Sequence, residues 1–256
     1  MDEKVTQEYA GQKMLDDDSV RIVNGYLPQN MLVEIASKPL LPQKIRKDIA
    51  LAAWVRAALL ENEQAVRNTS AVLSQIAPEM QEQLAGYAAG ATSQERKFAA
   101  SLIILKNPGM KPFIFEGIGR TTPLDKIDNF RNNWWCELGS ERNPLRRKAD
   151  HEGKKRGKRA DYPGFMTKEQ VQRTEQEMEA LQKAETAPNY LAGIILPWAE
   201  AHQDDPRVPE ALYLLVKATR YGCGDDETHE YSKAAFKLLH KRYPKSTWAK
   251  ETPYYF

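Results

Sequence analysis

Four helical patterns follow one another between residues 42 and 106, with almost no chain left between them. Apolar residues recur in each at the spacing of an α-helix rather than in the alternation of a strand. Pro78 and the triplet NPG at 107–109 end two of these patterns sharply. The expected helices cover residues 42–61, 63–76, about 79–89 and 93–106. Loops this short place successive helices side by side, so the region predicts a pair of αα-hairpins.

The first of these patterns, 42–61, carries two apolar stripes instead of one. Ile45 and Ile49 lie on one stripe, and Leu51 and Val55 lie on the other. A helix that is apolar on two sides packs between neighbours rather than on a surface. We therefore expect this helix at the centre of its part of the molecule.

The remainder of the chain is also read as helices. The tetrapeptide TKEQ at 167–170 is a capping box that opens a polar helix reaching about residue 184. A helix is expected after Pro188, and Pro197 is expected to kink or split it. Another helix is expected to follow, with Asp205 or its neighbour as its cap. No convincing sheet is present. The sequence predicts an all-α fold of stacked helix pairs, an α-solenoid, with an inserted basic loop.

Three parts are expected along the chain. They are an N-terminal helical lobe at 1–139, a basic loop or linker at 140–165, and a C-terminal helical lobe at 166–256. With 256 residues, 41% of them hydrophobic and 28% charged, the chain can bury a sizeable core. The net charge of +2 gives no field over the whole molecule that would favour nucleic acid or membrane.

The sequence contains no run of 18 apolar residues, so no membrane span is expected. Its first residues, MDEKVTQEYA, have neither the basic nor the apolar region of a signal peptide. Two localisations stay open at this point. The protein is periplasmic or part of the cell envelope if an export signal has been removed before Met1, and it is cytoplasmic otherwise.

The last 48 residues contain a pattern that can be compared with a known repeat. The segment 209–250 resembles a tetratricopeptide repeat, above all the variety found in bacterial cell-envelope proteins, whose second helix reads roughly AxxxFxxxxxxYPxS. The residues that carry the resemblance are Ala218 and Tyr221 in the first helix and Phe236, Tyr243, Pro244 and Ser246 in the second. A lone repeat cannot bury its own faces, so the upstream helix pairs are expected to supply its neighbours.

The resemblance implies a role as well as a fold. Repeats of this kind build scaffolds and docking surfaces for proteins. The leading hypothesis is therefore a non-enzymatic scaffold or docking module with a protein partner and no cofactor, forming the C-terminal part of a larger protein. Its oligomeric state is left open. A third reading is an enzyme whose active site lies in a segment absent from this chain.

The basic loop supports an alternative function. Its nine basic residues are Arg142, Arg146, Arg147, Lys148, Lys154, Lys155, Arg156, Lys158 and Arg159. Such a cluster can bind nucleic acid or another polyanion through salt-dependent phosphate contacts. The same residues also suit a mobile solvated loop or a targeting address of the KKRGKR type. The first of these three interpretations defines the runner-up function, an anionic-polymer binder.

The octapeptide NFRNNWWC at 129–136 combines aromatic rings with one of only two cysteines. Read as a short helix, it places Phe130, Trp134 and Trp135 largely on one side, where they would anchor a core. An exposed aromatic docking surface and a redox site at Cys136 are the other interpretations. A disulfide between Cys136 and Cys223 is possible, because no third cysteine competes for either of them.

Other patterns point to sites only weakly. FEGIGRTT at 115–122 could bind an anion, although a turn with positive-φ glycines explains it better. GDDETHE at 224–230 is rich in oxygens that calcium prefers, but an exposed loop between helices is the preferred interpretation. The four histidines have no partner at helical spacing, so no metal site is expected. No catalytic residue is assigned.

Overall fold

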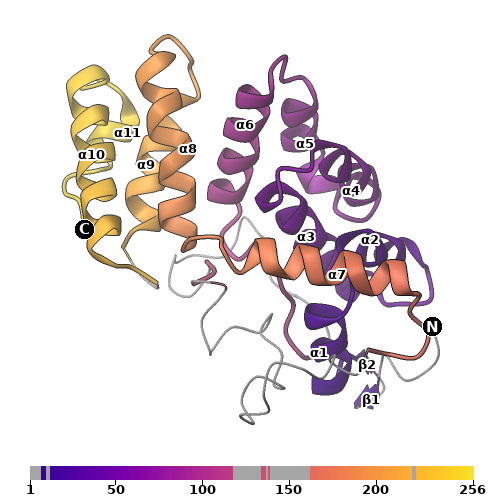
Figure 1. Cartoon of the computed structure of the whole chain (residues 1–256). Helices are drawn as coiled ribbons and strands as arrows, with labels where there is room; N and C mark the ends of the chain where they lie inside the picture. The colour runs from indigo at the N-terminus through magenta and orange to yellow at the C-terminus, as the bar shows by residue number, and fades with distance from the viewer. Residues whose placement is uncertain (1–6, 10–11, 118–133, 137, 139–161, 221–222) are drawn as a thin grey trace. The chain divides into compact units, whose positions relative to one another are not determined.

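The computed structural model of the chain describes residues 7–9, 12–117, 134–136, 138, 162–220 and 223–256 (Figure 1). These residues are predominantly helical, and neighbouring helices pack against one another. The all-α prediction is confirmed at this level. Whether the helix pairs continue as a solenoid stays a prediction.

Contacts divide the chain into two compact units. The first consists of Met1–Gln81, Lys111–Thr121 and Leu138–Ala184, and the second of Glu82–Met110, Thr122–Glu137 and Glu185–Phe256. Each unit draws segments from both predicted lobes, 1–139 and 166–256. The expected basic loop falls largely outside the described residues.

The first unit is built around one central helix. Its elements are β1 (Gln7–Tyr9), β2 (Gln12–Met14), α1 (Asp17–Gly25), α2 (Gln29–Ser37), α3 (Gln43–Leu59), α4 (Glu63–Ile76), the 3-10 turn η2 (Pro78–Met80) and α7 (Lys168–Leu181). Helix α3 packs against both α2 and α4. Ten of the residues between Ile45 and Ala57 are buried. The central position predicted from its two apolar stripes is therefore confirmed.

The N-terminal part of this unit was not anticipated. β1 and β2 pair antiparallel, with Glu8 opposite Lys13, although no sheet was expected. Leu15 then bridges to Gly117 through two main-chain hydrogen bonds of 2.8 and 2.9 Å. Gly117 has a φ of 115°, which a residue with a side chain adopts only with strain. The glycine-rich stretch at 115–122 is thus a bridge to Leu15 at its described end, and its residues from 118 onward lie outside the described part.

Helix α7 packs in the first unit through hydrogen bonds to residues that lie far from it in the sequence. Its capping box, formed by Thr167 and Gln170, is present as predicted. Inside the helix, the Thr174 hydroxyl donates to the main-chain oxygen of Tyr26 at 3.0 Å. Helix α7 ends at Leu181, three residues before the expected end.

A charged side chain lies in the centre of the first unit. Arg56, in the last turn of α3, is fully buried. Its guanidinium donates to the main-chain oxygens of Asn24, Leu27 and Pro112 at 2.9, 3.1 and 2.7 Å. Burial lowers the pKa of Arg56 to about 10, partly opposed by the negative charge of Glu177. The side chain therefore stays charged at neutral pH. It ties the end of α1 and the two irregular segments at Leu27 and Pro112 to α3.

The second unit is a group of neighbouring helices. They are α5 (Gln81–Ala88), α6 (Ser93–Lys106), α8 (Ala187–Ala201), α9 (Val208–Ala218), α10 (Asp226–Arg242) and α11 (Thr247–Lys250). Helices α8, α9 and α10 stand side by side, and α6 packs on α8 and α9 (Figure 1). An ion pair of 2.7 Å between Lys106 and Glu210 adds to that contact.

Helix α8 runs through Pro197 to Ala201, so the proline does not split it, and the alternative of a kink stays a prediction. Asp205 is not the cap of α9, whose N-cap is Arg207. The Asp205 carboxylate instead accepts hydrogen bonds from the main-chain N–H and the guanidinium of Arg207, and from the Trp198 indole. These hydrogen bonds lower the pKa of Asp205 despite its partial burial.

The interpretation of 224–230 as a loop was wrong. Helix α10 already begins at Asp226, because Asp225 and Thr228 form a capping box at its N-terminus. Asp225 accepts from the Thr228 main chain at 2.9 Å and from the buried Asn189 amide at 3.0 and 3.1 Å. The oxygens of this segment therefore stabilise a helix end.

Candidate functional site

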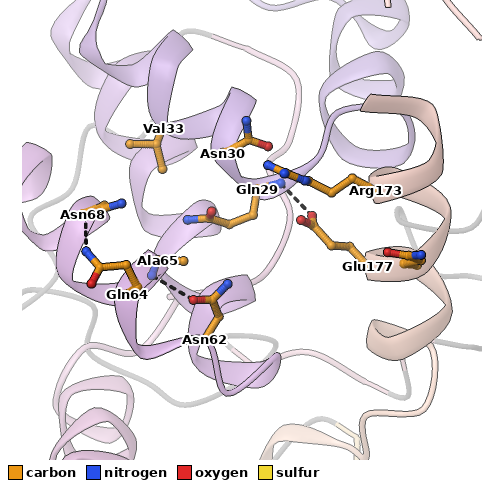
Figure 2. Close-up of a pocket in the computed structure, with 10 residues that line it drawn as sticks. Gln29, Asn30, Val33, Asn62, Gln64, Ala65, Asn68, Arg173 and Glu177 are labelled. Carbon is orange, nitrogen blue, oxygen red and sulfur yellow. Dashed lines mark hydrogen bonds between the residues drawn. The ribbon is translucent and has the colours of Figure 1, made fainter. Parts of the chain in front are cut away.

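A groove among the described residues of the first unit forms a concave site. It has a volume of about 520 Å³. Helices α2, α4 and α7 contribute its walls. The lining residues are Gln29, Asn30, Val33, Asn62, Gln64, Ala65, Asn68, Arg173, Gln176 and Glu177 (Figure 2). Six of these ten side chains are carboxamides, which offer both a hydrogen-bond donor and an acceptor.

Gln29, at the start of α2, is the most buried of the carboxamides, with 6% of its surface exposed. Its Nε2 donates to the Thr69 hydroxyl at 2.9 Å. That hydroxyl in turn donates to the main-chain oxygen of Ala65 at 2.7 Å. Thr69 is fully buried, so this chain of hydrogen bonds holds the Gln29 side chain in one place.

The α4 side of the groove is organised by two local hydrogen bonds. Asn62, the N-cap of α4, accepts from the Ala65 main chain at 3.0 Å. One turn further on, Gln64 Nε2 donates to Asn68 Oδ1 at 2.8 Å (Figure 2). Gln64 and Asn68 are both exposed and are four residues apart on the helix. This pair leaves Gln64 an acceptor oxygen and Asn68 a donor amide.

The α7 side carries the two charged groups. Glu177 Oε2 accepts a hydrogen bond of 2.7 Å from the Gln29 main-chain N–H, at the otherwise uncapped N-terminus of α2 (Figure 2). Burial raises the pKa of Glu177, although this hydrogen bond and the charges of Arg56 and Arg173 oppose the rise. With one acid and one base, the lining is close to neutral.

The lining therefore suits a neutral ligand that is rich in donors and acceptors. It contains no hydroxyl, thiol or imidazole that could act as a nucleophile or transfer protons near neutral pH. It contains no aromatic ring either. What the groove offers is hydrogen bonding from three helices of a packed unit.

The basic residues singled out in the sequence, from Arg142 to Arg159, lie outside the described residues, and so does Phe130. Trp134 and Trp135 are buried, with 4% and 0% of their surfaces exposed. The Trp135 indole donates to the main-chain oxygen of Glu185 at 3.1 Å. The main-chain oxygen of Trp135 accepts a hydrogen bond from the Ala187 main-chain N–H at 3.0 Å. These two tryptophans thus do not form an exposed aromatic docking surface.

Cys136 and Cys223 are joined by a disulfide, with their Cα atoms 5.0 Å apart. The bridge links the buried tryptophan pair to the segment before α10, both within the second unit. Cys136 itself is exposed and Cys223 is half-buried. Because both sulfurs are bonded, Cys136 does not act as a free thiol in this structure.

Of the residues that carry the repeat-like resemblance, Ala218 is buried at the end of α9, and Tyr221 lies outside the described residues. The others lie in α10 and just after it. Phe236 is half-buried, with its ring centroid 4.2 Å from that of His240 and 5.4 Å from that of Tyr255. The Tyr243 hydroxyl donates to the main-chain oxygen of Gln203 at 2.7 Å. Pro244 is exposed. The groove and these residues belong to different units.

No lining residue of the groove was singled out from the sequence. The only signal was the density of amides at the start of α4, in NEQAVRN at 62–68. Amides on an exposed helix face are common, so this signal becomes meaningful only when α2 and α7 lie opposite them. Among the part of the chain that the structure describes, no group of acidic, histidine or cysteine side chains is arranged to hold a metal ion.

The described helices include none with the length and apolar character needed to cross a bilayer. Comparison with known proteins gives no further guide. No protein family, no curated protein and no solved structure matches the chain.

Proposed function

We propose that the protein is a non-enzymatic docking module, and that a segment of a partner protein binds in the groove between α2, α4 and α7. The observation that carries the proposal is the concentration of six carboxamide side chains around a cavity of about 520 Å³. A cavity of this size accommodates a short segment of chain. The tetratricopeptide-like pattern at 209–250 supports the same class of function from the other unit.

The chemistry of the lining favours a binding role over a catalytic one. Glu177 is already engaged with the main chain of α2, and Arg173 is the only basic side chain of the lining. An enzyme of acyl, phosphoryl or glycosyl transfer needs a nucleophile, a metal or a pair of free acid and base groups. The groove lining supplies hydrogen-bonding amides in their place.

A selection of displayed peptides on the full-length chain tests this function. The selected peptides are then measured against a variant with Q64A and N68A, which removes two carboxamides from the α4 side. The matched control is Q75A, because Gln75 is an exposed amide on the same helix outside the groove.

We expect the double variant to weaken binding at least roughly tenfold, as two hydrogen bonds at an interface are lost. The control is expected to bind like the unchanged chain. Failure to select any peptide, or equal binding by all three proteins, would rule out the groove as a protein-docking site.

The runner-up function is binding of an anionic polymer by the basic segment 142–159. Nine basic residues in that span are the observation that favours it. Binding to heparin or nucleic acid that falls steeply with salt and disappears on deletion of 142–159 would support it. Binding that is unaffected by the deletion would remove it.

A further inference from the structure

We infer that the groove recognises the main chain of an extended peptide, through a fixed acceptor on α2 and a donor–acceptor pair on α4. This inference rests on the proposed docking function and specifies the chemistry of the bound segment. It predicts recognition that depends on peptide N–H and C=O groups and tolerates many side chains.

The orientation of the Gln29 carboxamide follows from its partners. The single hydrogen of the Thr69 hydroxyl is used in the bond to the Ala65 oxygen. The group of Gln29 that faces this hydroxyl must then be the donor, Nε2. The remaining atom, Oε1, is left as an acceptor on a side chain that is more than nine-tenths buried and lines the groove.

No donor among the described residues reaches Gln29 Oε1 within hydrogen-bonding distance. This oxygen is not among the side-chain atoms that are buried without a hydrogen-bond partner, so it is accessible from the groove. A ligand N–H or O–H can therefore donate to it. Thr69 does not touch the ligand; it is a positioning residue that fixes which atom of Gln29 faces outward.

The α4 wall presents the complementary pair. Because Gln64 Nε2 donates to Asn68 Oδ1, the atoms left for a ligand are Gln64 Oε1 and Asn68 Nδ2. One accepts and the other donates, which matches the N–H and C=O that an extended peptide presents along its edge. The near-neutral lining fits an uncharged main chain better than it fits a polyanion.

The choice of a peptide over an oligosaccharide rests on the rest of the lining. Sugar rings present apolar C–H faces that pack well on aromatic side chains, and the groove has only Val33 and Ala65 as apolar groups. An extended peptide needs no such surface, since its side chains alternate to either side of the main chain.

The side-chain NH₂ signals of Gln29 and Asn68 in a ¹⁵N-labelled full-length chain allow a direct test. The probe is the neutral peptide acetyl-Thr-Ala-Thr-Ala-Thr-Ala-amide, added to millimolar concentration. The same peptide with N-methyl groups on alternate residues lacks half of the N–H donors, and maltohexaose serves as the oligosaccharide arm.

The expected result is a shift of both NH₂ signals with the first peptide and at least roughly fivefold weaker binding of the N-methylated form. The N68D variant exchanges the donor for an acceptor on an exposed residue, and its matched control is Q75E on the same helix. N68D is expected to weaken binding at least roughly fivefold, whereas Q75E is expected to leave it unchanged.

Three results would overturn the inference. They are no shift with the unmodified peptide, equal binding of the N-methylated form, and shifts with maltohexaose in place of the peptide. If displayed peptides bind the groove but N-methylation has no effect, recognition is through side chains, and docking survives while this inference fails. If no peptide binds at all, the proposed docking function fails with it.

Discussion

Glu177 accepts a hydrogen bond of 2.7 Å from the main-chain N–H of Gln29, which lies 148 residues earlier in the chain. Helix α2 begins after Pro28, which has no side chain that could cap it. A carboxylate from α7 therefore does what an N-cap residue ordinarily does, close to the positive end of the α2 dipole. The same contact forms one end of the amide-lined groove.

The raised pKa of Glu177 makes a prediction about stability and pH. A carboxyl whose pKa is higher in the folded chain than its ordinary 4.5 keeps its proton where the unfolded chain has lost it. Its contribution to stability is then largest at low pH and falls as pH rises through that interval. We expect E177Q, which is neutral at every pH, to be at least as stable as the unchanged chain at pH 7 and equal to it below about pH 4.

E177A removes the acceptor itself, so it should lower the free energy of unfolding by about 1 kcal/mol at pH 7. Urea denaturation at several pH values measures both variants. E175Q is the control, because Glu175 is an exposed residue on the same helix. If E177Q loses as much stability as E177A at pH 7, then the attraction of the Arg56 and Arg173 charges outweighs burial. The pKa of Glu177 would then not be raised by folding.

The buried guanidinium of Arg56 gives a second prediction. R56M would leave the oxygens of Asn24, Leu27 and Pro112 buried without their donor. Each buried acceptor without a partner costs about 1–3 kcal/mol, so a loss of at least 3 kcal/mol is expected. The stability of R56K should lie between that of R56M and that of the unchanged chain, because a single ammonium cannot match three carbonyls with the geometry of a guanidinium.

Thermal and urea unfolding measure this series, with R67M on the exposed face of α4 as the control. An R56M chain as stable as the R67M chain would show that the three oxygens find water instead.

Arg56 also illustrates what could and could not be predicted from the sequence. The periodicity of 42–61 placed α3 correctly and indicated burial on two sides, because apolar spacing reports local structure directly. A basic residue in a buried helix turn was visible in that pattern, but its acceptors come from Asn24, Leu27 and Pro112, which no local rule connects to it. Long-range hydrogen bonds of this kind depend on the tertiary fold.

The groove was unpredictable for the same reason. Its walls come from α2, α4 and α7, and α7 follows α4 by more than 90 residues. The sequence predicted α4 and the capping box of α7 well, whereas α2 and the hairpin of β1 and β2 were not anticipated. Short elements contain too few residues for a clear apolar periodicity, so they are hard to predict from the sequence. Without α2, neither Gln29 nor its contact with Glu177 could be proposed.

The error at 224–230 leads to a third prediction. Asp225 was counted as a loop residue, yet it caps α10 and binds Asn189. D225A should lower the stability of the chain by about 1–2 kcal/mol, whereas D226A, one residue on and exposed, should cost much less. Added calcium should not raise the melting temperature of the unchanged chain, because the Asp225 carboxylate already accepts hydrogen bonds from Thr228 and Asn189.

The pH dependence of this cap has the opposite sign to that of Glu177. Hydrogen bonds from Asn189, and then from Thr228, lower the pKa of Asp225 below its ordinary 3.8. The stabilisation is therefore present above the unfolded pKa and is lost as pH falls through the lower, folded value. The stability difference between the unchanged chain and D225A should shrink under strongly acidic conditions. A difference that stays constant down to pH 2 would show that the cap does not depend on ionisation.

The disulfide between Cys136 and Cys223 gives the last prediction. It closes a loop with a sequence separation of 87 residues, and the chain-entropy model assigns such a loop a stabilisation of roughly 4–5 kcal/mol. The double variant C136S/C223S should therefore unfold at a lower urea concentration than the unchanged chain, and reductant should destabilise only the unchanged chain. The loss should include release of Trp135, whose contacts with Glu185 and Ala187 lie next to the bridge.

Thiol titration under denaturing, non-reducing conditions decides whether the bridge forms in the purified protein. No reactive thiol is expected before reduction, and two are expected after it. Tryptophan fluorescence follows the second part of the prediction, since Trp135 is buried at 0% exposure and should shift to the red on reduction. Two free thiols per chain at the outset would contradict the bridge between Cys136 and Cys223.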